Sequence, residues 1–262
     1  MASATRKAQA AARAALQTLE GTSDISLAEE LFSAGRAIGS SLQLRTLLAE
    51  PAGDAEVKAA AVRAVFGSSL SANALSLLVS IVSERWSRAD DLLASIEDVA
   101  IRCAADSTDA DVASELFAIE QMVTSSPELE LSLGSKLASA SGKAELVSAL
   151  LGERVSAATL AIVRHLVQQP RGRRLSRLVT DAARIVAEQE NSVLATVSTA
   201  SPLDDSSRDR LRSALSGRYG NVRFNELVDP SLVGGVRIVI GDEVIDGSVA
   251  ARLAELRQQL AG

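Results

Sequence analysis

Apolar residues recur at three- and four-residue spacing along most of the chain, from residue 2 to about residue 188. Because this spacing places side chains on one face of an α-helix, the pattern predicts a series of amphipathic helices. Short clusters rich in Ser, Gly and Asp separate the apolar runs and mark the expected helix ends. The first helix is expected over residues 3–19, and the side chains expected to cap later helices are Ser26, Asp54, Ser71 and Ser156.

The pattern changes near residue 190, where β-branched and partly alternating residues replace the helical spacing. Alternation of this kind predicts strands, and a two-residue turn at Gly241-Asp242 predicts a hairpin. The predicted fold is therefore mainly α, with a small α+β domain at the C-terminus. Strands are expected over residues 192–200, 222–228, 236–240 and 243–245, and helices over residues 204–216 and 249–260.

The helical part contains an internal repeat at an offset of 85 residues, which aligns residues 27–100 with residues 112–185 without gaps. The strongest stretch sets Ala28-Glu29-Glu30-Leu31-Phe32 against Ala113-Ser114-Glu115-Leu116-Phe117. Chance similarity between two Ala- and Leu-rich helical stretches is the alternative. Identical Phe, Lys, Gly and Arg residues that match at the same 85-residue offset, without gaps, favour a duplication instead. We therefore expect a duplicated helical bundle followed by the small domain, with copy one at residues 1–105, copy two at 106–190 and the C-terminal domain at 191–262.

Composition limits what the protein can do. Apolar residues make up 47% of the 262 residues and aromatics only 2%, so the cores must consist mainly of Leu, Val, Ile and Ala. The single tryptophan, Trp86, is expected to pack in a core or at a bundle rim. The net charge is −6, which argues against a nucleic-acid partner. No apolar run approaches the ~20 residues that span a bilayer, so no direct membrane insertion is expected. The densest basic cluster is expected to be solvated at a helix end or in a loop; it comprises Arg171, Arg173, Arg174 and Arg177.

No constellation of catalytic residues is recognisable in the chain. The only histidine is His165 and the only cysteine is Cys103, so a histidine-based relay or a multi-cysteine metal site is not expected. Gly234, Gly235 and Gly241 fit no phosphate-binding loop, because a strand follows them rather than a helix. Backbone geometry around a hairpin explains these glycines better. We expect neither a metal nor a cofactor.

The C-terminal segment carries an ordered set of short motifs. Asp229-Pro230-Ser231-Leu232-Val233-Gly234-Gly235 is followed, about ten residues later, by Ile245-Asp246-Gly247-Ser248-Val249. This combination resembles the delta subunit of bacterial F-type ATP synthases, which is called OSCP in mitochondria. We interpret the signature residues as structural: Asp229, Pro230, Gly234, Gly235, Gly241, Ile245, Asp246 and Ser248. Packing onto the sheet or a partner is expected of the stripe formed by Val249, Leu253, Leu256 and Leu260.

The resemblance implies a non-catalytic stator subunit in the peripheral stalk of an F-type ATP synthase, at the cytoplasmic face of the plasma membrane. The N-terminal bundle would grip the N-terminal helices of the alpha subunits. The C-terminal domain would hold the b subunit, so that the head resists torque during proton-driven ATP synthesis. A helical adaptor of another assembly and an enzyme with an unrecognised acidic site are the alternatives.

The resemblance covers the whole chain only if the duplication is accepted, because a typical family member has one six-helix bundle. Copy two lacks a separate first helix, since only residues 101–111 separate the repeats. We expect the last helix of copy one to take that place. Copy one has the complete set of helices, so we expect it to bind the head, with copy two as a spacer or second clamp.

Overall fold

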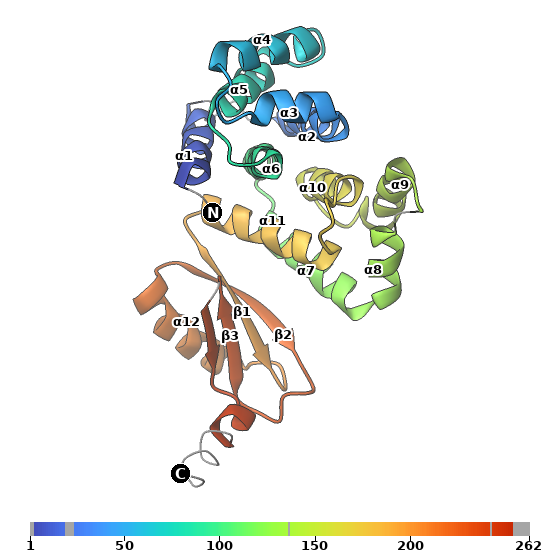
Figure 1. Ribbon diagram of the computed structural model, residues 1–262. Helices are drawn as coiled ribbons and strands as arrows, with labels where there is room; N and C mark the ends of the chain where they lie inside the picture. The colour runs from blue at the N-terminus through green and yellow to red at the C-terminus, as the bar shows by residue number, and fades with distance from the viewer. Residues whose placement is uncertain (1–2, 19–23, 136, 242, 254–262) are drawn as a thin grey trace.

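The computed structural model describes residues 3–18, 24–135, 137–241 and 243–253. The helical part forms two groups of helices that share a central helix, with the C-terminal domain beneath them in Figure 1. Copy one comprises α1 (Ser3–Gln17), α2 (Ile25–Ser40), α3 (Leu42–Ala49), α4 (Ala55–Phe66), α5 (Ala72–Ser83) and α6 (Ala89–Asp106). Copy two comprises α7 (Val112–Ser125), α8 (Pro127–Gly134), α9 (Ala140–Leu151), α10 (Ala157–Gln168) and α11 (Leu175–Gln189).

The C-terminal domain is a four-stranded mixed sheet with one helix packed on it. The strand order is β2-β1-β3-β4, with β1 parallel to β2 and antiparallel to β3. The predicted fold class, mainly α with a small α+β domain, is confirmed. Residues 249–253 are helical, while Asp242 and the rest of the predicted last helix, including Leu256 and Leu260, lie outside the described residues. The elements are β1 (Val193–Thr199), α12 (Asp205–Tyr219), β2 (Val222–Val228), β3 (Val236–Ile240) and β4 (Glu243–Asp246).

The 85-residue offset found in the sequence recurs in the helices and in their caps. Helices α3, α4 and α5 begin and end 85 residues before α8, α9 and α10. Ser71 caps α5, and its backbone N–H and hydroxyl both donate to Glu30. Ser156 caps α10 and donates to Glu115 in the same way. The two halves therefore share local hydrogen bonds as well as helix order.

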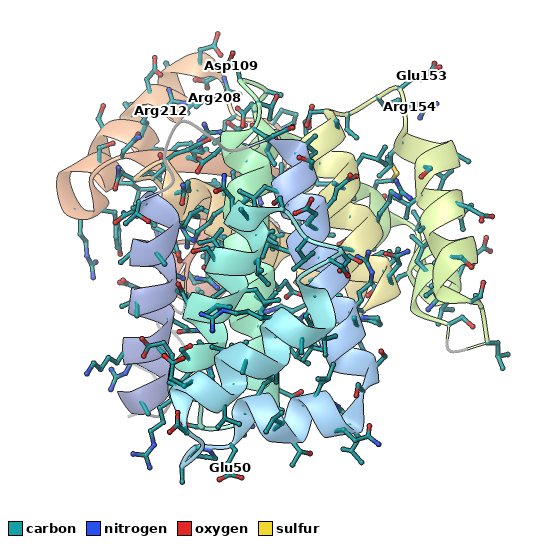
Figure 2. The ribbon with its side chains drawn as sticks, turned by 90° about the horizontal axis from the view of Figure 1, so that it is seen from above. Glu50, Asp109, Glu153, Arg154, Arg208 and Arg212 are labelled. Carbon is teal, nitrogen blue, oxygen red and sulfur yellow. The ribbon has the colours of Figure 1, made fainter. Side chains whose placement is uncertain are left out.

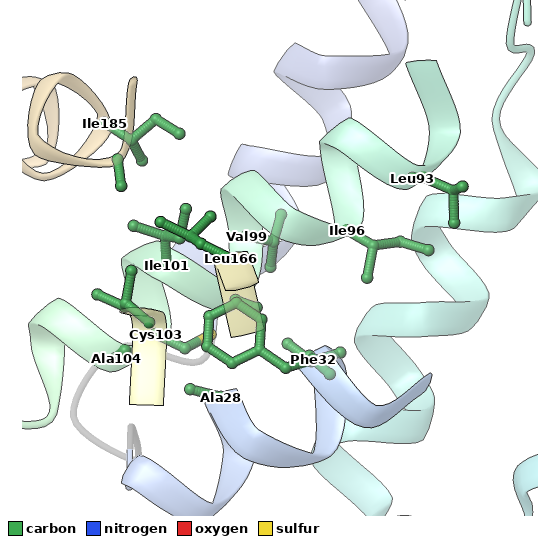
Figure 3. Packing of buried hydrophobic residues seen from close by; sticks show 14 of the residues in the cluster. Ala28, Phe32, Leu93, Ile96, Val99, Ile101, Cys103, Ala104, Leu166 and Ile185 are labelled. Atoms are coloured by element: carbon green, nitrogen blue, oxygen red, sulfur yellow. The ribbon is translucent and has the colours of Figure 1, made fainter. Parts of the chain in front are cut away.

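Helix α6 belongs to both halves. It packs against α2 and α5 of copy one and against α10 and α11 of copy two. Helix α1 packs against α5 and α6 in the same way, so α6 occupies in copy two the place that α1 occupies in copy one. One continuous apolar core crosses the seam: Figure 3 shows Phe32 of α2 beside Ile96, Val99 and Cys103 of α6 and Leu166 of α10.

Three of the four predicted N-cap residues are confirmed, and one prediction is wrong. Asp54, Ser71 and Ser156 each accept a hydrogen bond from a backbone N–H in the first turn of their helix. Ser26 was expected to open the second helix, but α2 begins at Ile25 and Asp24 is its N-cap residue. The Ser26 hydroxyl donates to the Asp24 carboxylate, 3.1 Å away. Asp24 and Ser26 are both of N-cap type and lie two residues apart, and Asp24 adopts the extended backbone that a cap requires.

Candidate partner-binding faces and the joints between them

A buried carboxylate on α6 ties the two copies together. Glu97 is 6% exposed and accepts from three side chains of copy two. The Nη2 atom of Arg171 lies 2.7 Å from its Oε1, and Nη2 of Arg173 lies 2.8 Å away. Its Oε2 lies 3.3 Å from Nε2 of His165. Buried charges require partners of this kind, so Glu97 organises the seam between the copies.

His165 carries the contact from α6 across to α2. Its ring stacks on Phe32 with the centroids 4.3 Å apart, and its Nδ1 lies 3.3 Å from Nη1 of Arg36. A guanidinium can only donate, so Nδ1 accepts and Nε2 carries the hydrogen that Glu97 receives. Burial lowers the pKa of His165, which keeps this neutral form at neutral pH. The amide of Gln169 adds a bond to the carbonyl of Gly35, 3.2 Å away.

The charges around Glu97 change its titration. Burial would raise the pKa of this carboxyl, but the hydrogen bond from His165 and the charges of Arg171 and Arg173 lower it to about 2. The expectation that the arginine cluster is solvated is therefore wrong for these two side chains. Arg171 is the more buried of the two, and its Nη1 has no hydrogen-bond partner among the described residues.

The repeat has no equivalent of this joint within copy one. Ala12 stands at the position corresponding to Glu97, and Trp86 stands at the position corresponding to Arg171. Trp86 is fully buried, as expected for core packing, and its Nε1 donates to the carbonyl of Ile81 at 2.8 Å. The buried apolar side chain of Trp86 in copy one thus corresponds to the buried ion pair between Arg171 and Glu97 in copy two.

A second joint connects copy two to the C-terminal domain. Arg223 of β2 pairs with Asp111, just before α7, and with Glu190, just after α11, where the Nη2–Oε2 distance is 2.6 Å. The Gln121 amide on α7 donates to the backbone oxygen of Glu226 at 2.8 Å. Side chains of this joint are partly exposed, so it is more hydrated than the seam around Glu97.

Helix α2 covers the face of copy two that α6 and α10 form. Gly35 of α2 approaches Ile96 of α6, and Phe32 lies on His165 of α10. The corresponding face of copy one is formed by α1 and α5, and no other helix of the described chain is stacked on it in Figure 1. The 85-residue offset assigns small side chains to it, of which Ser76 is exposed and the others are partly exposed: Ala11, Ser76, Val79, Ser80 and Ser83.

The signature residues brace two segments of the C-terminal domain. Asp229 caps a turn by accepting from the N–H and hydroxyl of Ser231. Gly235 has φ +83°, and a Cβ there would lie 2.5 Å from the carbonyl oxygen of Gly247. Asp246 accepts from the N–H of Ser248, whose hydroxyl oxygen accepts from the N–H of Ala251.

The other signature positions have backbone or packing roles too. Pro230 lies in the turn that follows β2. Gly241 turns the chain between β3 and β4 with φ +58°, and Gly234 has φ +152° and its carbonyl accepts from the N–H of Val249. Ile245 is partly buried against the core of the domain. No reactive arrangement of side chains is formed by these residues.

The braced segments present apolar side chains to solvent. Val233 is 81% exposed, and Val249 and Leu253 are also exposed. The sequence indicated a stripe through Val249 and Leu253 but gave no reason to single out Val233. The Glu97 joint was also missed; the available signal was an acidic residue inside the apolar run of α6.

Neither a bilayer-spanning helix nor a metal-binding group of side chains is found in the part of the chain that the structure describes. The features that the described residues do show are joints and exposed faces. Together with two groups of helices that share α6 and a small mixed sheet, they are typical of a helical connector between other proteins.

Comparison with known proteins gives the family. The family model described as the ATP synthase delta (OSCP) subunit matches residues 98–260, and the chain belongs to this family. ATP synthase subunit delta of Leifsonia xyli is 49% identical over 100% of both chains. The subunit delta of Streptomyces avermitilis is 38% identical over 98% of both. A chain of the Toxoplasma gondii mitochondrial ATP synthase hexamer is a weaker match, with a TM-score of 0.41 and 23% identity, covering 63% of this chain and 96% of that chain.

Membership in the family makes the chain a structural, non-catalytic stator subunit. The match to the family begins at residue 98, inside α6, and runs through copy two into the C-terminal domain. Copy two therefore has a complete set of helices once α6 is counted. The subunits of Leifsonia xyli and Streptomyces avermitilis match over 100% and 98% of this chain, so the part before residue 98 also has a counterpart in them.

Proposed function

We propose that copy one binds the catalytic head, through N-terminal helices of the alpha subunits, and that the C-terminal domain holds the b subunit of the peripheral stalk. Copy two is a rigid spacer between them. The subunit then acts at the cytoplasmic face of the plasma membrane, where it prevents the head from turning during proton-driven ATP synthesis.

The position of α2 is the main support for the proposal that copy one binds the head. Within this chain an amphipathic helix already covers the face formed by α6 and α10. The face formed by α1 and α5 corresponds to it at the 85-residue offset and is free of such a helix in the described structure. A partner helix that recognises this kind of face can therefore reach it on copy one and not on copy two.

The side chains of the α1–α5 face suit a helix that approaches closely. Ser80 and Ser83 donate their hydroxyl hydrogens to carbonyls of their own helix, at Ser76 and Val79. These hydroxyls therefore demand few hydrogen bonds from a partner. Val79 and Ala11 add apolar surface of low relief, into which larger side chains of a partner helix can fit.

The proposal for the C-terminal domain is supported by the exposed apolar side chains Val233, Val249 and Leu253. The hydrogen bonds of Asp229, Asp246 and Ser248 hold the segments that carry these side chains. Apolar side chains gathered on a rigid support are typical of a protein–protein contact.

The test of the head-binding proposal is a binding titration of the full chain with a peptide of the alpha-subunit N-terminus. Val79→Arg introduces on α5 the residue that copy two has at the corresponding position, Arg164. We expect this variant to weaken binding at least about tenfold, because a charge must be buried or displaced. Val65→Arg is the matched control, since Val65 is an exposed valine on α4 of the same copy.

Binding that survives Val79→Arg unchanged, while the control behaves like the wild-type chain, would count against the α1–α5 face. Loss of binding in both variants would indicate a general effect of added charge and would also contradict the assignment. Circular dichroism of each variant shows whether the fold is intact.

A further inference from the structure

An open cavity of ≈ 210 Å³ lies on the seam between the two copies. Helix α2 contributes Glu29, Phe32 and Arg36 to its wall, and α10 contributes Arg164, His165 and Gln168. Each copy thus supplies one arginine. Neither the proposed binding of the head nor that of the stalk uses this cavity.

The two arginines are not neutralised by ion pairs. Within the described residues, no carboxylate lies at ion-pair distance from Arg36 or Arg164; Glu29, the acid of the cavity wall, pairs with neither. Arg36 is partly buried, and among the described residues its guanidinium makes one hydrogen bond, from Nη1 to Nδ1 of His165 at 3.3 Å. Burial lowers the pKa of Arg36 and the nearby charge of Arg164 lowers it further, while the charge of Glu29 opposes the shift without reversing it.

The remaining donors of the cavity are also unused. The side-chain amide of Gln168 and the guanidinium of Arg164 have no hydrogen bond to another described residue. His165 is neutral and offers Nδ1 only as an acceptor to Arg36, so it adds no charge. Two guanidinium groups and an amide therefore surround a space that contains a single acid, in a chain whose net charge is −6.

We propose that this cavity binds a phosphate-class oxyanion, either free phosphate or the terminal phosphate of a nucleotide. Arg36 and Arg164 donate from opposite sides of the seam, and Gln168 adds a neutral donor. A guanidinium presents its donors in a planar fork that matches the oxygen atoms of such an anion. A tetrahedral oxyanion has more acceptor oxygen atoms than a carboxylate, so it can accept from both guanidinium groups at once. Once bound, it bridges α2 and α10 and so reinforces the contact between the copies.

The experiment measures the melting temperature of the full chain in rising concentrations of inorganic phosphate, at ionic strength held constant with sodium chloride. We expect the wild-type melting temperature to rise and to saturate, as it does when a ligand binds only the folded state. Arg164→Gln removes one fork at an exposed position and is expected to raise the half-saturating concentration at least about tenfold. Parallel titrations with ADP and with phosphate distinguish the two sources by which of them saturates at the lower concentration.

Arg154→Gln is the matched control, because Arg154 is exposed in the turn between α9 and α10 (Figure 2) and is absent from the cavity wall. It removes the same charge and should leave the phosphate response unchanged. An equal response in wild type and Arg164→Gln would overturn the proposal, and so would a phosphate effect no larger than that of chloride. Arg164 is not on the α1–α5 face, so the two proposals are tested separately. A negative phosphate titration leaves the head-binding proposal intact, and a negative peptide titration leaves the phosphate proposal intact.

Discussion

Replacing Glu97 by Gln tests whether the buried carboxylate fastens the two copies together. The substitution keeps the size of the side chain but removes the charge that Arg171 and Arg173 share. Glutamine keeps one acceptor oxygen for the two arginines, but its amide nitrogen replaces the oxygen that accepts from Nε2 of His165, so that hydrogen bond is lost together with the charge. What is lost is the electrostatic compensation of two arginines that are partly or largely buried.

The size of the effect follows from the titration of Glu97. Its pKa falls from 4.5 to about 2 in the folded chain, because His165 and the two arginines outweigh the effect of burial. A shift of this size corresponds to about 3 kcal/mol of folding free energy, at about 1.4 kcal/mol per pKa unit. Since the folded pKa is depressed, this stability is present above pH 4.5 and is lost as the pH falls toward 2. We therefore expect Glu97→Gln to lower the free energy of unfolding by about 3 kcal/mol at pH 7, and by less than half of that at about pH 3.

Urea unfolding followed by tryptophan fluorescence measures this difference, because Trp86 is the only tryptophan and is fully buried. Glu153→Gln is the control: Glu153 is exposed in the turn between α9 and α10 (Figure 2) and should change stability by less than about 0.5 kcal/mol. A loss below about 1 kcal/mol for Glu97→Gln at pH 7 would refute the reasoning. A loss of the same size at both pH values would refute it as well, since the carboxylate charge could not then be its source.

Three further outcomes are expected. Trp86→Ala should destabilise the chain by about 3–5 kcal/mol in urea unfolding followed by circular dichroism at 222 nm, because a fully buried indole and its bond to Ile81 are lost. Gly235→Ala should weaken binding of a b-subunit peptide and lower the melting temperature, since a Cβ would collide with the Gly247 carbonyl and φ is +83°. Cys103 should react with a thiol reagent only after denaturation, at a rate that follows unfolding, because it is fully buried and burial raises its pKa to about 12.

The elements that sequence predicted well are those fixed by neighbouring residues. Ser71 and Ser156 are recognisable because an N-cap residue and the apolar spacing after it lie within one helical turn. The strand at residues 222–228 is bounded by Gly220 on one side and Pro230 on the other, and the structure has the same limits. The structural role of the signature residues stays a prediction, which rests on the local hydrogen bonds of Asp229 and Asp246 and on the positive φ angle of Gly235.

The joints between the parts could not be predicted in this way, because their members are far apart in sequence. His165 and Arg173 lie 68 and 76 residues after Glu97, and each has an ordinary appearance in its own helix or loop. Local reasoning assigned Arg173 to solvent because basic residues near helix ends are usually hydrated. Only the position of α6 between both copies brings these charges together.

The sharing of α6 decides where this stator subunit can bend. Two bundles joined by a loop could rotate about it, but here one helix is a core element of both. Bending at that seam would have to open the continuous apolar core and separate Glu97 from its arginines. The junction near residue 190 is different, because the C-terminal domain is attached there by β1, by packing on α11 and by partly exposed pairs such as Arg223 with Glu190. Exposed ion pairs contribute about 0–1 kcal/mol each. Elastic deformation under torque should therefore concentrate between α11 and β1, while the two bundles move as one body.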